Sequence, residues 1–470
     1  MKPGRVLPLI AFLWSTGAVF ARSHTAAANP SALSAAVSTY CVTCHNSRLA
    51  EAKIALDNLD AQRPWAAANT WERVLRQLRA GTMPPADNPR PDRKTTDALV
   101  SELSSALDHG DPGKIQTAPR RVEDVELAAR LANLLWSSAP DAALLDFAGK
   151  GRLHNPAVLE TQIRRMLADP RSAALVSGFF DEWLGLNRLA AMPADAAAFP
   201  EFDSPLLQAL RRETELFVGS QLREDRPAVE LWTANYTYLN GRLARLYGIP
   251  NITGPRFRRV TLEGTGRAGL LGEGSFLIAT SVLTRHAAVD GPSTSPAARA
   301  KWIRVHFLDV PMRDPLPNLP PLQKGILLSA QLRTLPDPTC TECHANYFPI
   351  GYALENFDPL GRWRTEAENE PIDVSGTLAD GTEFTGPVEL RRVLLERRDA
   401  FLTTITERLL AYAAGGKPGI FQATPAARMP AVRAILREAE MKHYTWSALF
   451  GGIAGSALFQ AERTRVPGGP

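Results

Sequence analysis

Two copies of one five-residue pattern, Cys-x-x-Cys-His, constrain this 470-residue chain more than any other feature. They occupy residues 41–45 and 340–344 and use all four cysteines. Two cysteines one helical turn apart can each form a thioether with a vinyl group of haem, and the histidine that follows then lies beneath the iron as its proximal ligand. We therefore predict two covalently attached haem c groups. The attachment residues are Cys41, Cys44, Cys340 and Cys343, and the proximal ligands are His45 and His344.

Two other kinds of site also use Cys-x-x-Cys pairs. A thioredoxin-like redox pair does not need a histidine directly after the second cysteine, yet both copies have one. Zinc ribbons join two such pairs with roughly 15–20 residues between them, whereas here most of the chain separates them. Haem attachment therefore fits the pattern better than a dithiol or a zinc site.

The first 21 residues have the order of a secretory signal peptide. Lys2 and Arg5 precede an apolar run over residues 6–20, and the small residue Ala21 follows it. The alternative is a membrane anchor, but about 15 apolar residues are short for a span, which needs about 20. We expect cleavage near Ala21, a periplasmic mature protein and no stable membrane insertion after cleavage. Export agrees with the motif, because haem is attached to Cys-x-x-Cys-His proteins outside the cytoplasmic membrane.

The composition is that of a globular protein and disfavours one class of partner. Hydrophobic residues make up 45% of the sequence and charged residues 22%, and about 450 mature residues suffice for two or three domains. The formal net charge is only +4, and the sequence has no basic run with interleaved aromatic residues. Nucleic acid is therefore not expected as a partner. The expected partner is a redox protein of the periplasm.

Most long segments show helical spacing, and we predict a mainly α protein with three regions after the signal peptide, residues 1–21. Residues 25–110 are expected to form a cytochrome c-like helical domain. Residues 118–255 are expected to form a helical middle domain that serves as scaffold and interface. Residues 256–470 are expected to form a second haem-binding helical domain with a small β-hairpin.

The first region predicts three helices. One leads into Cys41, and the next two cover residues 69–80 and 95–108. Asn69 and Glu72 resemble a capping box at the start of the second helix. Its stop signal is Gly81, and the apolar face of the third helix consists of Leu99, Leu103 and Leu107.

The last region has clear signals near its C-terminal end. Residues 377–384 predict a tight hairpin, because Asp380-Gly381 suits positive φ angles at a turn. Two amphipathic helices are then expected, over residues 387–414 and 430–443.

Methionine is the expected second axial ligand of an electron-carrying haem c, because its thioether fills the sixth position and raises the potential. Met83 follows the helix stop in a Pro-flanked loop, and we predict that it binds the first iron. For the second iron we favour Met429, which also precedes a proline. The alternatives are His286, His306, Met312, Met441 and His443, or an empty sixth position.

With these motifs the chain resembles the multi-domain cytochrome-like proteins of planctomycetes and related bacteria, which combine a planctomycete-type cytochrome c with several domains of unknown function. The resemblance extends over nearly the whole mature chain. The stretches that carry it are 41–46, 81–85, 134–141, 165–170, 182–186, 236–240, 243–248, 351–364 and 429–433, together with Trp71. It implies the fold and the haem content, raises Met429 above its rivals and supplies no established reaction. One departure is Ala300, where the family motif has glycine.

The residues after the second motif allow two interpretations. Arg362, Trp363 and Arg364 could pair with haem propionates and line an electron path, whereas Glu355 and Asp358 could serve as acid–base groups beside an open iron. The simpler interpretation is that the two acids cap and pack a local turn. We favour it, since perturbed charged groups also occur in purely structural ion-pair networks.

Two functions of different classes follow. The first is a periplasmic dihaem cytochrome that carries out electron transfer, in which the first haem exchanges electrons with partners and the second passes them on. The alternative is a haem enzyme, a peroxidase or another oxidoreductase, in which the first haem feeds electrons to an open second iron. For that alternative the sequence identifies no catalytic residue. A weaker third interpretation makes the middle region a docking scaffold.

Overall fold

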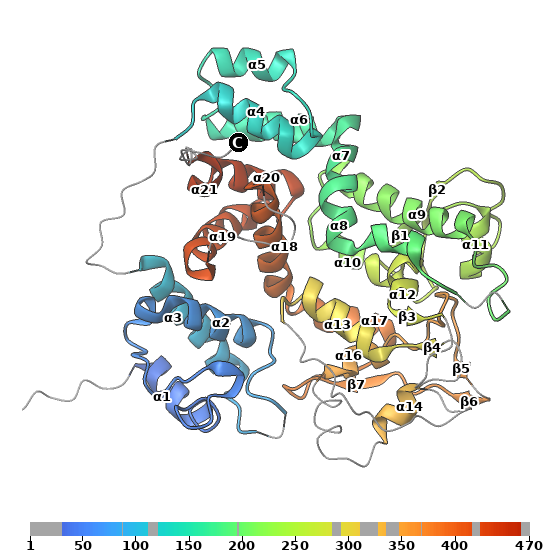
Figure 1. Ribbon diagram of the computed structural model, residues 1–470, viewed down its shortest axis with the longest axis horizontal. Coiled ribbons are helices and arrows are strands. Elements are labelled where there is room, and N and C mark those ends of the chain that lie inside the picture. The colour runs from blue at the N-terminus through green and yellow to red at the C-terminus, as the bar shows by residue number, and fades with distance from the viewer. Residues whose placement is uncertain are drawn as a thin grey trace, which may run out of the picture.

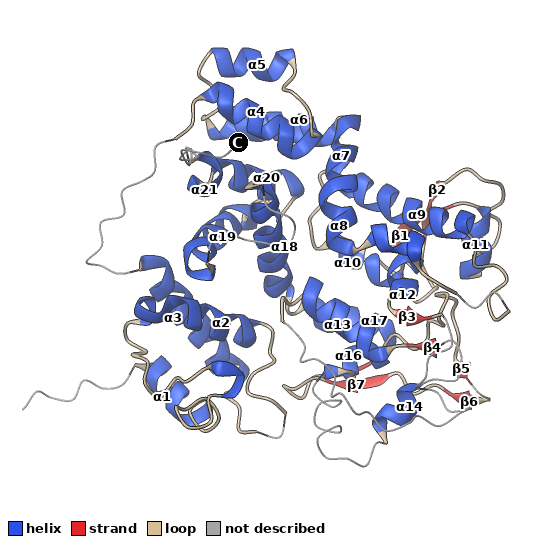
Figure 2. Ribbon diagram, viewed as in Figure 1, coloured by secondary structure: helices blue, strands red, loops and turns tan. Residues whose placement is uncertain are grey.

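Helices dominate the structure, which is a computed structural model (Figure 1), and Figure 2 shows how little strand it contains. The structure describes residues 31–86, 88–110, 121–194, 197–283, 293–310, 328–334, 347–367, 369–415 and 424–461. The predicted mainly α fold is confirmed, and every sheet within those ranges is two-stranded. The predicted signal peptide and the second Cys-x-x-Cys-His motif lie outside the described residues. None of the helices in the described ranges has the length and apolar character that crossing a bilayer requires.

Three helices build the first region: α1 (Ala32–Tyr40), α2 (Ala68–Arg79) and α3 (Arg93–His109). Two short 3-10 segments, η1 (Glu51–Lys53) and η2 (Pro64–Ala67), lie between α1 and α2. The predicted helices over 69–80 and 95–108 are thereby confirmed, with the usual small differences at their ends. The helices pack around a shared core that contains Leu33, Val37, Trp71, Leu75, Leu99, Leu103 and Leu107.

The rest of the chain forms a larger helical body (Figure 1). Its helices are α4 (Asp124–Trp136), α5 (Ala142–Gly149), α6 (Pro156–Ala168), η3 (Pro170–Ser172), α7 (Ala173–Leu175), η4 (Val176–Phe180), α8 (Asp181–Leu184), η5 (Leu186–Ala191), α9 (Ser204–Arg223), α10 (Glu230–Thr233), α11 (Gly241–Tyr247), η6 (Leu270–Gly272), α12 (Gly274–Ala279), α13 (Pro296–His306), α14 (Leu328–Arg333), α16 (Pro349–Tyr352), α17 (Gly386–Leu395), α18 (Arg398–Ala413), α19 (Pro425–Glu440), α20 (Trp446–Gly455) and α21 (Ala457–Gln460). Its antiparallel strand pairs are β1 (Tyr236–Leu239) with β2 (Arg258–Thr261), β3 (Ser281–Val282) with β4 (Ser293–Thr294), β5 (Glu366–Ala367) with β6 (Glu370–Pro371), and β7 (Ser375–Thr377) with β8 (Glu383–Thr385).

One continuous hydrophobic cluster extends through this body. Phe180 packs edge-to-face on Trp446 of α20, with ring centroids 5.6 Å apart, and Trp232 of α10 packs in the same way on Phe401 of α18 at 5.2 Å. Each such pair contributes about 0.5–1.5 kcal/mol beyond the area that it buries. Residues of the predicted middle domain thus share a core with residues of the predicted second haem domain. The division of the chain near residue 255 stays a prediction.

The predicted capping box at α2 is wrong. The N-cap of α2 is Ala67, and no side chain caps it. Asn69 Oδ1 instead accepts a hydrogen bond from the backbone N–H of Ala426 (3.0 Å), and Glu72 Oε2 accepts one from Arg433 Nη1 (2.9 Å). Both side chains are therefore engaged by α19, and these long-range contacts replace the local cap.

The hairpin near the C-terminus is confirmed, but the helix that follows it differs from the prediction. Strands β7 and β8 pair antiparallel, and Gly381 takes a positive φ of 82° at the turn. The single helix expected over residues 387–414 is divided into α17 and α18. The two helices are separated at Arg397, whose backbone angles, φ −108° and ψ 23°, are not helical.

The last predicted helix starts earlier than expected. Residues 430–443 were expected to be helical, whereas α19 begins at Pro425. Thr424 and Pro425 occupy the N-cap and first helical positions, where proline is favoured, and this start signal outweighs that of Pro430. Met429 consequently lies inside α19 and not in a loop before a helix.

A buried carboxyl group lies in the core of the body. Glu213 on α9 accepts hydrogen bonds from Tyr247 Oη (2.5 Å) and Thr237 Oγ1 (2.8 Å), and the buried guanidinium of Arg267 stacks on the Tyr247 ring at 3.8 Å. Burial raises the pKa of Glu213 to about 7, although the two hydroxyl groups and the Arg267 charge favour the ionised carboxylate. Burial and the charge of Glu213 also raise the pKa of Glu273.

We expect the free energy of unfolding to fall as the pH rises from about 5 to about 8, because a carboxyl group with a raised folded-state pKa keeps a proton that the unfolded chain releases. Glu213→Gln removes this titration and leaves an oxygen for Tyr247 and Thr237. Between about pH 5 and about pH 8, the free energy of unfolding of the variant should therefore fall by less than that of the wild type, by on the order of 2 kcal/mol. Urea unfolding at both pH values measures this difference. The control is Glu215→Gln on the same helix, which pairs with Arg211. Equal pH slopes in the two variants would contradict the prediction.

Candidate haem site

The first Cys-x-x-Cys-His motif forms a tight turn at the end of α1. The backbone N–H of Cys41 donates to Val37 O (3.0 Å) and continues the helix, and the N–H of His45 donates to Cys41 O (2.9 Å). Both thiols are half-buried, and burial raises the pKa of Cys41 to about 11. The turn therefore places Cys41 and Cys44 one helical turn apart, as thioether attachment requires.

His45 is oriented by the chain that follows the motif. Its Nδ1 lies 3.1 Å from the carbonyl oxygen of Glu51, and its own carbonyl oxygen accepts a hydrogen bond from Leu56 N (2.7 Å). When Nδ1 donates a proton to this carbonyl, Nε2 keeps its lone pair for a metal. Backbone contacts alone therefore prepare His45 as an axial ligand.

Asn46 holds the motif together, a role that the sequence analysis did not assign. Its Nδ2 donates to the carbonyl oxygens of Val42 (2.9 Å) and Thr43 (3.0 Å), and its Oδ1 accepts hydrogen bonds from the N–H groups of Arg48 and Leu49 (both 3.0 Å). The available signal was the type of residue, because asparagine side chains commonly bond to nearby backbone in turns.

Met83 lies in the loop between α2 and α3. Gly81 ends α2 with a φ of +67°, and the backbone N–H of Thr82 donates to Gln77 O (3.1 Å). The Met83–Pro84 peptide bond is cis, and the Met83 side chain is half-buried. Arg90 Nη2 donates to Gly81 O (3.0 Å) and lies 3.5 Å from Met83 O. The loop backbone is thus fixed from both sides of Met83.

The residues of this region fit a covalently attached haem. Trp71 Nε1 is buried in the core between the helices and has no hydrogen-bond partner among the residues that the structure describes. A buried indole N–H usually has an acceptor, so this donor fits a polar group of the haem. Together with Cys41, Cys44, His45 and the thioether of Met83, it makes a donor set suited to haem c.

The second predicted site cannot be built in the same way. Its residues, Cys340, Cys343 and His344, lie outside the described residues, between α14 and α16. The second haem stays a prediction from the sequence pattern.

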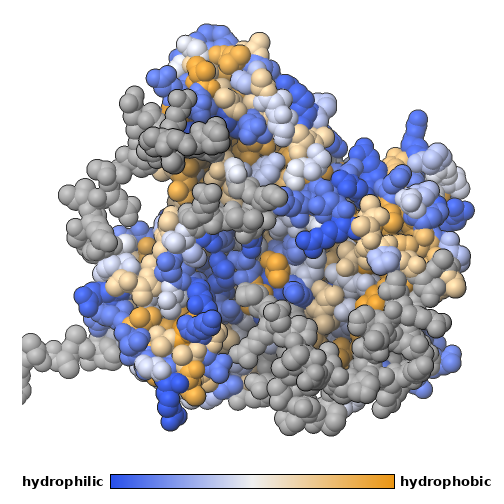
Figure 3. All heavy atoms as spheres, in the orientation of Figure 1, coloured by the Kyte–Doolittle hydropathy of each residue, from blue (hydrophilic) through white to orange (hydrophobic). Residues whose placement is uncertain are grey.

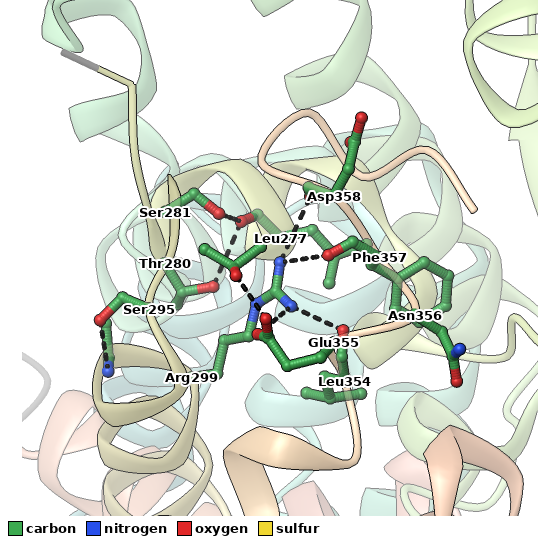
Figure 4. Close-up of polar contacts among 12 residues, drawn as sticks. Leu277, Thr280, Ser281, Ser295, Arg299, Leu354, Glu355, Asn356, Phe357 and Asp358 are labelled. Atoms are coloured by element: carbon green, nitrogen blue, oxygen red, sulfur yellow. Dashed lines mark hydrogen bonds and ion pairs between the residues drawn. The ribbon is translucent and has the colours of Figure 1, made fainter. Parts of the chain in front are cut away.

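Glu355, which follows the second motif, forms a buried ion pair (Figure 4). Its Oε1 lies 3.1 Å from Arg299 Nη1, and neither side chain is exposed. Arg299 also donates to the carbonyl oxygens of Leu354 (2.6 Å) and Phe357 (2.9 Å). Burial lowers the pKa of Arg299 to about 10, although the Glu355 charge acts against this. These contacts favour the structural interpretation of Glu355 over acid–base chemistry.

The neighbouring charged residues also have protein partners. Asp358 bonds to Arg362 Nε (2.6 Å), and Arg362 Nη1 reaches Glu201 (2.8 Å). Arg364 Nη2 lies 3.2 Å from Glu355 Oε2. Pairing of these arginines with haem propionates would therefore have to compete with existing ion pairs.

Met429 lies close to the first haem region. It is 3% exposed and lines a small cavity with residues of α2 and α18, among them Arg76, Arg79 and Thr404. In Figure 1, α19 lies beside α18 and apart from α14 and α16, the helices that flank the second motif. Ligation of the second iron by Met429 stays a prediction.

The competing ligands for the second iron differ in their surroundings. His306 is half-buried and stacks on Trp302 with ring centroids 4.3 Å apart. Its Nδ1 lies 2.8 Å from Trp302 O and its Nε2 lies 2.7 Å from Trp183 O. A neutral imidazole has one N–H, so it can donate to only one of these carbonyl oxygens. Burial lowers the pKa of His306 to about 4. Met441 and His443 are exposed on the surface. His286 and Met312 lie outside the described residues.

Four family descriptions match consecutive parts of the chain. Residues 41–87 match planctomycete cytochrome C. Proteins of unknown function are matched by residues 122–249 (DUF1592), 267–367 (DUF1588) and 380–459 (DUF1585). Neither the curated proteins nor the solved structures gave a match. The cytochrome match on Cys41 and Cys44 indicates at least one covalent haem c. The chain thus has a planctomycete cytochrome c domain followed by three domains of unknown function.

Proposed function

We propose that this c-type cytochrome is a periplasmic dihaem protein whose role is electron transfer. The observation that carries the proposal is the His45 geometry, in which the Glu51 carbonyl binds Nδ1 and leaves Nε2 for the iron. When bound, the haem supplies an iron that takes up and returns single electrons. Cys41 and Cys44 would hold it covalently, and Met83 would supply a sulfur ligand that raises the potential.

Several features support a carrier at the first site. If Met83 fills the sixth position, the iron would have no position for a substrate, and ligation by His45 and Met83 would favour outer-sphere electron transfer over catalysis. Glu355 and Asp358, the candidate acid–base groups, are engaged in ion pairs. The proposed partner is a periplasmic redox protein, in keeping with the signal peptide predicted over residues 1–21.

One observation favours a second candidate, a haem enzyme such as a peroxidase with an open second iron. Both ring nitrogens of His306 face backbone carbonyl oxygens, and Met429 lines a small cavity with residues of α2 and α18. If neither leaves these surroundings, and if His286, Met312, Met441 and His443 do not bind the second iron, its sixth position is free for a small molecule.

We expect two haem groups per chain in protein matured with covalent haem attachment. Cys44→Ala should lower the covalent haem content at the first motif, and Cys343→Ala should lower it at the second, because each change removes one of the two thioether bonds of its motif. Mass spectrometry of the denatured chain measures the number of bound haems. Wild-type protein with a single haem, unchanged by Cys343→Ala, would contradict the dihaem proposal.

We expect the ferrous first haem to bind carbon monoxide only after Met83 is replaced. In Cys343→Ala protein the ferrous spectrum should not respond to carbon monoxide, whereas the added change Met83→Ala should give a carbon monoxide complex, because the sixth position is then open. The control is Met192→Ala, which truncates another half-buried methionine. Equal responses to carbon monoxide in the two methionine variants would contradict ligation of the first iron by Met83. A response of the wild-type protein that Cys343→Ala abolishes would favour the enzyme.

A further inference from the structure

The Met83 loop is in direct contact with the C-terminal part of the chain. A Cβ atom at Gly81 would lie 3.2 Å from Asp380 Oδ2 and 3.4 Å from Arg397 Nε. Asp380 belongs to the turn between β7 and β8, and Arg397 lies between α17 and α18. A loop that is expected to supply an iron ligand therefore rests on two charged side chains that are some 300 residues away along the chain.

Asp380 and Arg397 form a fixed unit. They make an ion pair in which the Arg397 side chain is only 10% exposed. Arg397 also donates to Val393 O (3.0 Å) and to Thr382 Oγ1 (3.3 Å). Burial acts to raise the pKa of Asp380, but the Arg397 charge and the hydrogen bonds from Thr382 outweigh it, so the pKa is lowered. Asp380 is therefore charged at neutral pH.

Arg90 connects this pair with the Met83 backbone. Its Nη2 donates to Gly81 O at 3.0 Å and lies 3.5 Å from Met83 O. Burial lowers the pKa of Arg90, Asp380 opposes this and Arg397 adds to it, so the three charges lie close enough to interact. Arg90 thus binds the carbonyl groups of the loop and lies within the electrostatic field of Asp380 and Arg397.

The first haem region cannot easily move away from this contact. Arg433 on α19 is 5% exposed and binds Glu72 of α2 (2.9 Å) and Asp108 of α3 (2.6 Å). Arg76 on α2 also binds Asp309 (2.9 Å). Figure 3 shows hydrophilic side chains where the α1–α3 region meets the larger body. Buried ion pairs of this kind are directional, so they determine which part of the body faces the Met83 loop.

We propose that Asp380 and Arg397 are positioning residues for the Met83 loop, through which the C-terminal domain sets how firmly Met83 binds the first haem iron. The inference rests on the proposed ligation by His45 and Met83. A looser loop lowers the occupancy of the sulfur on the iron, and because the thioether raises the potential, it also favours the oxidised haem. Coupling between two sites is reciprocal, so the redox state of the first haem in turn biases the contact with Asp380 and Arg397.

The test uses the full-length protein with its haem and compares Asp380→Asn and Arg397→Gln with the wild type. Two quantities are measured: the weak far-red band of ferric haem that reports a methionine ligand, and the reduction potential of the first haem. The part of the band that belongs to Met83 is the part that Met83→Ala removes. We expect each variant to weaken this band and to shift the redox equilibrium about tenfold toward the ferric form, which is about 59 mV for a one-electron couple.

Two further variants separate positioning from general effects. Glu396→Gln removes a negative charge from the neighbouring residue, which pairs with Arg93 (3.7 Å) and Arg392 (2.8 Å), and it should leave both readings unchanged. Arg397→Lys keeps the charge and should restore part of the band. Thermal unfolding monitored by circular dichroism checks the fold of each variant, and Asp380→Asn, the change closest in shape to the wild type, decides the outcome if Arg397→Gln unfolds.

The two proposals fail in different ways. If Met83→Ala leaves the far-red band unchanged, the ligation by Met83 fails and the positioning role fails with it. If Met83→Ala removes the band but Asp380→Asn matches Glu396→Gln in band and potential, the ligation stands and the positioning role is overturned.

Discussion

The arrangement of the first haem region relative to the larger helical body depends on the ion pairs of Arg433. Its guanidinium is almost fully buried and binds one carboxylate from α2 and one from α3. Removing both carboxylates would leave a buried charge without compensation, which typically costs about 3–5 kcal/mol. Because Glu72 and Asp108 belong to different helices, the contact fixes the orientation of the first haem region and not merely its proximity. The Met83 loop, at the end of α2, is carried to Asp380 and Arg397 as a consequence.

The predictable parts of this structure are those whose causes are local. The helices over 69–80 and 95–108 follow from apolar spacing, and the hairpin follows from the turn preference of Gly381. The haem motif is equally visible, since two covalent bonds and one axial ligand demand a fixed spacing. In each case the residues that determine the feature lie within a few positions of one another, where the sequence displays them directly.

Features that depend on distant partners were not predictable in this way. Asn69 and Glu72 have the spacing of a capping box, and the local pattern cannot reveal that Ala426 and Arg433 lie beside them. The same holds for Glu355, whose spacing from the second motif allows chemistry but whose partner is Arg299. A charge-assisted hydrogen bond to a distant partner outweighs a local cap, and for Glu72 and Glu355 that partner is an arginine.

The break between α17 and α18 shows how such a departure serves the site. An uninterrupted helix over 387–414 would satisfy local propensity, yet Arg397 adopts non-helical angles at this point and its side chain reaches Asp380 and lies against Gly81. The ion pair with Asp380 and the hydrogen bonds to Val393 O and Thr382 Oγ1 compensate for the interrupted helix. Here the contacts belong to the loop of a predicted axial ligand. The helix break at Arg397 and the position of the Met83 loop are therefore connected through the same contacts with Asp380 and Gly81.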